Sequence, residues 1–114
     1  ARNGSARERE IAAPFIDWGM DTVELLPAVH AACPTLNLIG SGGVRHGLDI
    51  ARCIRLGAQT TALAQPFLEP ALESTEAVVE KAAILQEQLR WAMFLTGSQN
   101  LSQLRNAAIQ LPRR

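Results

Sequence analysis

Three common features are missing from this 114-residue sequence: long apolar runs, an excess of charge of one sign, and clustered metal ligands. No stretch approaches the roughly 20 consecutive apolar residues that a membrane-spanning helix needs. The charged first ten residues also differ from a secretion signal. We therefore expect a soluble, cytoplasmic protein that has no membrane partner.

The formal net charge is +0, because eleven Lys and Arg residues balance eleven Asp and Glu residues. The two kinds are interspersed, whereas proteins that bind nucleic acids gather basic residues on one continuous surface. This pattern excludes nucleic acid as an expected partner. It leaves room for a small anion-binding site.

The sequence has only two cysteines, Cys33 and Cys53, and two histidines, His30 and His46. Their spacing is not that of a metal-binding motif, and a zinc site would need an unusual arrangement of these four side chains. We therefore expect two reduced structural thiols and no metal site.

What the sequence does contain is an alternation of helical and strand patterns, typical of an α/β fold whose strands are parallel in one sheet. Pro27 should kink the first helix or move its effective start to about Leu26. Residues 1–13 form a polar lead, of which residues 1–10 could be a helix end or disordered and are left unassigned. An ordered apolar loop is expected at 14–20. The expected elements are a helix at 22–32, a strand at 36–39, a helix at 48–56, a strand at 60–64, a short helix at 67–72, a long helix from 74 that stops at Gly97, and a short helix that Asn100 caps and that ends before Pro112.

A glycine-rich turn, Gly40 to Gly43, joins the first expected strand to the next helix. A phosphate bound there would gain hydrogen bonds from unpaired backbone amides, attraction to the helix dipole and the guanidinium charge of Arg45. The alternative is a turn that merely connects strand to helix, and the local pattern slightly favours the phosphate site. It is neither a Walker loop nor a dinucleotide fingerprint, because its glycine spacing fits neither and no Gly-Lys-Ser/Thr follows.

The segment after the second strand favours the phosphate site. The second expected strand ends at Gln65-Pro66, and the chain then leads directly into the short helix at 67–72. In TIM barrels a common phosphate site is built by the loops after strands seven and eight, together with a short extra helix. A complete (β/α)8 barrel takes about 250 residues, so we expect only the last two strands and their helices, an incomplete barrel that is a piece of a longer one.

The stretch from Ser41 to Asp49 resembles the seventh-strand turn of several FMN-dependent barrel enzymes, including α-hydroxy-acid oxidases and type 2 isopentenyl-diphosphate isomerases. Three further motifs resemble the isomerase family in particular: Phe15–Gly19, Pro66–Glu69 and Ala92–Gly97. The resemblance covers about residues 14–105. It identifies residues 1–114 as the C-terminal segment of an FMN-dependent TIM-barrel domain, with 36–72 as the FMN-phosphate-binding strand and turn units and 74–111 as terminal helices.

The resemblance implies an enzyme of isoprenoid biosynthesis that interconverts isopentenyl diphosphate and dimethylallyl diphosphate, with reduced FMN moving the proton. It implies Mg²⁺, NADPH and a homo-oligomer for the complete enzyme. Carried over by position, Gly43, Val44 and Arg45 form one FMN-contacting run, and Ala64 and Gln65 the other. Gln65 departs from the family pattern, so only its backbone is expected to matter.

No catalytic or metal-binding residue is expected here, because the family's substrate and magnesium ligands belong to earlier strands. The isolated chain should therefore be inactive. Two other hypotheses remain: another FMN-dependent barrel oxidoreductase, such as an α-hydroxy-acid oxidase, or a non-catalytic interaction module in which the long helix docks on a partner. Trp18 is interpreted as a packing residue rather than a flavin contact, and His46 as a solvated turn residue rather than a phosphate contact.

Overall fold

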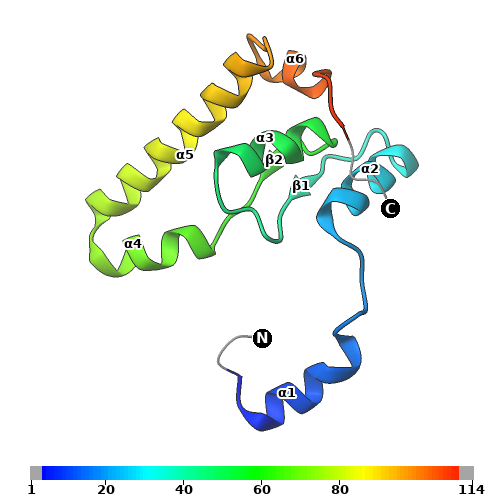
Figure 1. Ribbon diagram of the computed structural model, residues 1–114, viewed down its shortest axis with the longest axis vertical. Helices are drawn as coiled ribbons and strands as arrows, with labels where there is room; N and C mark the ends of the chain where they lie inside the picture. Colours follow the sequence, from blue (N-terminus) through cyan, green and yellow to red (C-terminus); the bar gives the residue numbers. More distant parts are fainter. Residues whose placement is uncertain (1–3, 111–114) are drawn as a thin grey trace.

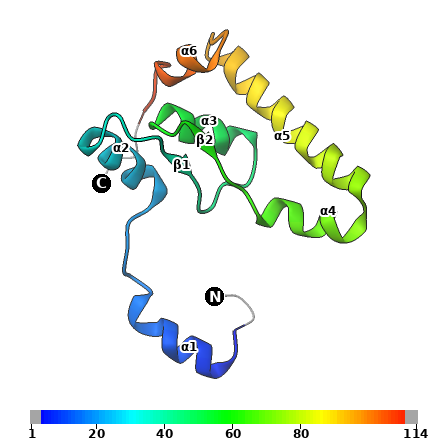
Figure 2. The same cartoon turned by 180° about the vertical axis from the view of Figure 1, so that it is seen from behind.

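A computed structural model describes residues 4–110 of the chain (Figures 1 and 2). Its elements are α1 (Ala6–Ala12), η1 (Ala13–Phe15), α2 (Thr22–Ala32), β1 (Ile39–Gly40), α3 (Gly47–Arg55), β2 (Thr60–Thr61), η2 (Gln65–Phe67), α4 (Leu68–Glu73), α5 (Thr75–Leu95) and α6 (Leu101–Arg105). In the part of the chain that is described, no helix is both long and apolar enough to cross a membrane. The order matches a mostly helical α/β arrangement.

The two strands pair in parallel, with Ile39 opposite Thr60 and Gly40 opposite Thr61, as the sequence predicts. Helix α3 forms the crossover between them. Two further backbone hydrogen bonds extend the ladder, from the Gln59 amide to the Leu38 carbonyl (2.8 Å) and from the Ala62 amide to the Gly40 carbonyl (2.9 Å). Both strands are shorter than the predicted 36–39 and 60–64, because these hydrogen bonds join only residues 38–40 to residues 59–62, and β1 includes Gly40 of the predicted turn.

The core lies around α3, which packs between the strand pair and α5 (Figure 1). One buried cluster joins α2, the strand loops and α3, and contains Leu26, Val44, Cys53, Leu56 and Ala58. A second joins α3 to the C-terminal helices and contains Ala51, Ile54, Ala92 and Leu104. Since α3 contributes to both clusters, it is the element that fixes the strands relative to α5.

The predicted boundaries of the long helix are confirmed. The Ser74 hydroxyl caps α5 by accepting from the Ala77 amide (3.0 Å), and Gly97 follows its end with a φ of 70°, a left-handed conformation that favours glycine. In α6 the Asn100 side chain accepts from the Gln103 amide at 2.9 Å, also as expected. The Gln103 side chain accepts from the Gln99 amide at 2.7 Å. Residue 111 of the predicted terminal segment lies outside the described residues.

In the N-terminal segment α1 forms, so the described part of the polar lead is helical, which is one of the two alternatives left open by the sequence. Ser5 and Glu8 make a reciprocal capping box: the Ser5 hydroxyl accepts from the Glu8 amide at 3.2 Å, and the Glu8 carboxylate accepts from the Ser5 amide at 3.3 Å. None of the residues of α1 is buried, and α1 stands apart from the other helices in both views (Figures 1 and 2). Local capping rather than core packing therefore defines this helix, while residues 1–3 of the predicted lead lie outside the described part.

Helix α2 begins at Thr22, so the alternative start near Leu26 is wrong. Pro27 lies inside the helix and removes one backbone donor. Leu26, only 7% exposed, anchors the same turn in the core. The burial of Leu26 offsets the free energy lost with the hydrogen bond that Pro27 cannot donate.

The apolar stretch at 14–20 is exposed. Trp18 is 79% exposed and meets Phe15 edge to face, with ring centroids 5.8 Å apart. Ile16 is 83% exposed. Trp18 thus contacts a local aromatic partner and does not enter either buried cluster of the described chain.

Cys53 lies in the core and Cys33 on the surface. Burial, and to a lesser degree the negative charge of Asp49, raises the pKa of the Cys53 thiol. Because the thiolate is the reactive form, we expect iodoacetamide at pH 7.5 to alkylate Cys53 slower than Cys33 by on the order of tenfold or more. Peptide mass spectrometry over time measures both rates, and equal rates would place Cys53 outside the core.

Candidate functional site

The glycine-rich turn reverses the chain between β1 and α3. Gly42 and Gly43 have φ angles of 85° and 74°, a left-handed conformation that side chains rarely adopt. A Cβ built on Gly43 would meet no atom within 4 Å. Glycine is therefore required there for conformation rather than for close packing, and the space beside Gly43 is open to a ligand.

The turn is held from two sides. The Thr22 hydroxyl of α2 lies 3.0 Å from the Ser41 carbonyl and 3.3 Å from the Gly42 carbonyl. The Val44 side chain, 6% exposed, is part of the first buried cluster. The sequence places Thr22 only at the start of a helix, and no local pattern indicates its contact with the turn.

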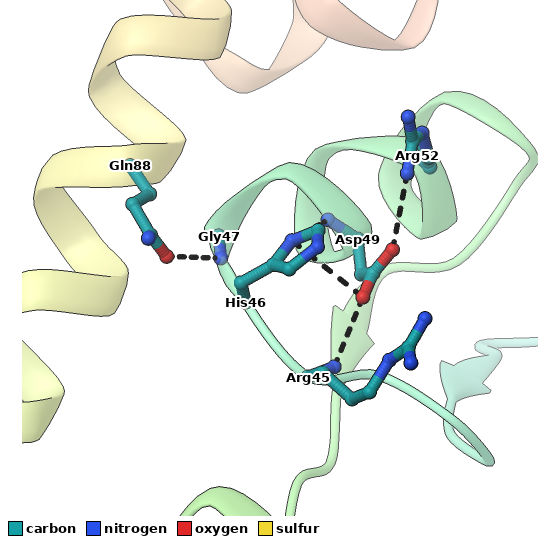
Figure 3. A network of polar contacts seen from close by, with 6 residues as sticks. All are labelled: Arg45, His46, Gly47, Asp49, Arg52 and Gln88. Carbon is teal, nitrogen blue, oxygen red and sulfur yellow. Dashed lines mark hydrogen bonds and ion pairs between the residues drawn. The ribbon is translucent and has the colours of Figure 1, made fainter.

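Asp49 organises the start of α3 (Figure 3). One carboxylate oxygen accepts from the Arg45 amide at 3.1 Å, and the other pairs with the Arg52 guanidinium at 3.2 Å. The Asp49 amide donates to His46 Nδ1 at 3.2 Å. His46 is thus the N-cap residue of α3, and its side chain is 42% exposed.

The amide of Gly47 donates to Gln88 Oε1 of α5 at 2.8 Å (Figure 3). Gly47 is buried directly against α5, since a Cβ there would lie 2.6 Å from the Leu89 amide nitrogen and still closer to the Leu85 carbonyl. The sequence does not indicate this role of Gln88, because its partner, Gly47, is 41 residues away.

These contacts decide which amides of the turn a ligand could use. Those of Arg45, Gly47 and Asp49 already have acceptors. Within residues 4–110 the structure gives the Gly43 and Val44 amides no acceptor, and it gives the exposed Arg45 guanidinium no ion pair. An anion beside Gly43 could therefore bind two backbone donors and one mobile positive charge.

The second predicted run, Ala64 and Gln65, follows β2 and leads into η2 and α4. Both residues are exposed. Because the carboxyl ends of parallel strands lie at the same edge of a sheet, this loop and the glycine turn leave the strand pair on the same side.

A cleft of about 630 Å³ lies between α3 and α5, with His46, Leu48, Gln88 and Trp91 among its lining residues. None of the five predicted site residues lines it. The cleft is apolar and belongs to the helical side of the molecule. In the described chain, no three His, Cys, Asp or Glu side chains gather as a metal site.

The fold is similar to parts of solved flavoenzymes. A mandelate oxidase mutant with a monooxide FMN adduct matches with a TM-score of 0.78 at 25% identity, over 85% of this chain and 32% of that one. Mandelate oxidase with 3,3-difluoro-2-hydroxy-3-phenylpropionic acid matches with a TM-score of 0.77 at 26% identity, over 84% and 30%.

In sequence the chain is homologous to isopentenyl-diphosphate delta-isomerases. It is 48% identical to that of Xanthobacter autotrophicus over 93% of this chain and 31% of the relative, and 46% identical to that of Stutzerimonas stutzeri over 96% and 32%. The isomerase of Halobacterium salinarum is 39% identical over 91% and 28%. The chain thus spans about a third of the length of these relatives.

A family model described as FMN-dependent dehydrogenase matches residues 15–111. That range includes the glycine turn, both strands and all elements after them. The match covers most of the chain, and the chain therefore belongs to the FMN-dependent dehydrogenase family.

Proposed function

We propose that this chain is the flavin-phosphate end of a TIM-barrel isomerase that interconverts isopentenyl diphosphate and dimethylallyl diphosphate in the cytoplasm. The observation that carries the proposal is the open turn at Gly42 and Gly43 in a chain of an FMN-dependent family; among residues 4–110, the Gly43 and Val44 amides have no acceptor and the Arg45 guanidinium has no ion pair. The strands β1 and β2 then correspond to the last two of the barrel, with residues 36–72 forming the phosphate-binding units.

The residues present fit a phosphate group. Amide donors, the N-terminus of α3 and the Arg45 guanidinium all favour negative charge at this turn. Ala64 and Gln65 would approach the same group through their backbone, because their loop leaves the same edge of the strand pair. When bound, reduced FMN supplies the proton transfer, and this chain's residues hold the flavin in place.

The isomerase assignment is favoured over an α-hydroxy-acid oxidase by identity: 48% to the Xanthobacter autotrophicus isomerase against 25% to the mandelate oxidase mutant. Mg²⁺, NADPH and a homo-oligomeric assembly belong to the proposal for the complete enzyme. The residues that bind substrate and metal then belong to the earlier strands of the barrel, so the chain itself supplies no catalytic group.

A graft tests the proposal. The matching third of the Xanthobacter autotrophicus isomerase is replaced by this sequence, and flavin content and dimethylallyl diphosphate formation are measured. We expect the chimera to purify with FMN and to form product. A folded chimera without flavin would contradict the phosphate site, and a flavin-loaded chimera without product would contradict only the isomerase assignment.

The isolated chain should neither isomerise isopentenyl diphosphate nor bind FMN tightly. Two paired strands leave apolar side chains such as Ile39 exposed (64%), and ordering the turn costs roughly 1–2 kcal/mol per residue fixed. The flavin ring would also find no barrel wall to stack against. Fluorescence quenching and product chromatography measure both activities, and micromolar or tighter FMN binding would contradict this expectation.

A further inference from the structure

The first turn of α3 is fixed by α5, a helix that begins 28 residues after Gly47 and joins the turn through one side chain. Gln88 Oε1 accepts the Gly47 amide proton at 2.8 Å, and this is a partly buried contact. At the N-terminus of a helix the first amides have no partner within the helix, so an acceptor from a neighbouring helix both satisfies the donor and sets the position of the turn.

The two helices also pack tightly at this place. A Cβ on Gly47 would fall within 2.6 Å of the Leu89 amide nitrogen, so the backbone of α3 lies directly on that of α5. The Gly47 amide can therefore point at Gln88 only while the helices keep this distance. The hydrogen bond and the close packing therefore fix the same position of the first turn of α3 on α5.

The position of Gly47 also affects the part of the turn that would face the ligand. Gly47 is four residues from Gly43, and the segment between them is tied at Val44 by the buried cluster and at Arg45 by Asp49. Each of these ties holds the turn to α3 or to the first core cluster. The hydrogen bond from Gly47 to Gln88 joins the turn to α5.

On the basis of the proposed function, we propose that Gln88 is a positioning residue for the flavin-phosphate turn. By accepting from Gly47 it holds the start of α3 on α5, and so keeps the Gly43 and Val44 amides in place before the phosphate arrives. Gln88 itself would not touch the phosphate. Its contribution is pre-organisation, which increases affinity by lowering the entropy lost on binding.

The first measurement is amide hydrogen exchange in the 114-residue chain. Gln88→Leu keeps the bulk of the side chain and removes the acceptor, and should speed exchange at Gly47 by about two- to tenfold, the effect of one neutral hydrogen bond. Gln88→Glu keeps an acceptor of the same reach and should restore protection at Gly47. Gln86→Leu is the matched control, because Gln86 is exposed on the same helix.

The second measurement is FMN affinity in the isomerase chimera. Gln88→Leu should weaken FMN binding by about two- to tenfold relative to Gln86→Leu. Leu104→Ala, a core substitution far along the chain from the turn, should lower the melting temperature without this loss of affinity. That contrast separates positioning from general stability.

Each outcome decides between the two proposals. A chimera with the original Gln88 that retains no flavin overturns the phosphate site and the role of Gln88 with it. A chimera that binds flavin equally well with Gln88→Leu and Gln86→Leu overturns only the role of Gln88. A Gly47 amide that exchanges as fast as the exposed amides in the unaltered chain would show that the hydrogen bond does not form.

Discussion

Replacing Gly47 by alanine should lower the melting temperature of the chain by on the order of 10–20 °C. The added Cβ would lie 2.6 Å from the Leu89 amide nitrogen and still closer to Leu85 and Gln88 atoms of α5, two of them backbone atoms that cannot rotate away. Overpacking of this kind costs about 3 kcal/mol when the backbone must move. In a domain of about 100 residues, each kcal/mol corresponds to roughly 4–8 °C.

Gly97→Ala is the matched control for Gly47→Ala. A side chain at Gly97 is also unfavourable, because the φ of this residue is 70°, but a Cβ there meets nothing within 4 Å. Its expected cost is about 1–2 kcal/mol from the left-handed backbone alone. Thermal unfolding followed by circular dichroism compares the two, and a Gly47→Ala protein as stable as Gly97→Ala would show that α3 and α5 do not meet closely at this point.

Arg45→Ala in the isomerase chimera should weaken FMN binding by about 10- to 150-fold. A charge-assisted hydrogen bond to phosphate contributes about 1.5–3 kcal/mol, and Arg45 is an exposed cation beside the turn with no ion pair in the described chain. Flavin content after dialysis and fluorescence titration measure the loss. Because the guanidinium is exposed, the difference should shrink as salt is raised.

Arg90→Ala provides the comparison for charge. Arg90 is an exposed arginine of α5 whose ion pair with Glu87 spans 3.6 Å, and exposed pairs of this kind contribute little. The two variants change net charge equally. FMN affinity that is the same in both would leave the phosphate to the backbone amides and would remove Arg45 from the site.

Much of the fold follows from local signals in the sequence. Ser74 and Gly97 bound α5 because capping and left-handed glycine are properties of a few adjacent residues. The parallel pairing of β1 and β2 follows from a strand, helix and strand order, which needs no knowledge of distant contacts. The extent of the strands was overestimated, since apolar runs do not show where a pairing partner ends.

The candidate site was predictable only in part. The glycines and Arg45 are visible as a turn pattern, whereas Thr22 and Gln88 are polar residues on helices with nothing nearby to mark them. Their partners lie 19 and 41 residues away. The predicted roles of Gly43, Val44, Arg45, Ala64 and Gln65 toward FMN stay predictions until affinity is measured.

The hydrogen bond between Gly47 and Gln88 also affects the order in which parts of the chain fold. A contact that closes 41 residues forms after local helices do, because closing a longer loop costs more entropy, about 0.6 kcal/mol for each doubling of its length. The turn can therefore reach its final shape only once α5 has folded back onto α3. During synthesis, the amides of residues 43 and 44, which are the proposed phosphate donors, should become ordered only after α5 has left the ribosome, so loading of the proposed cofactor would follow completion of the C-terminal helices.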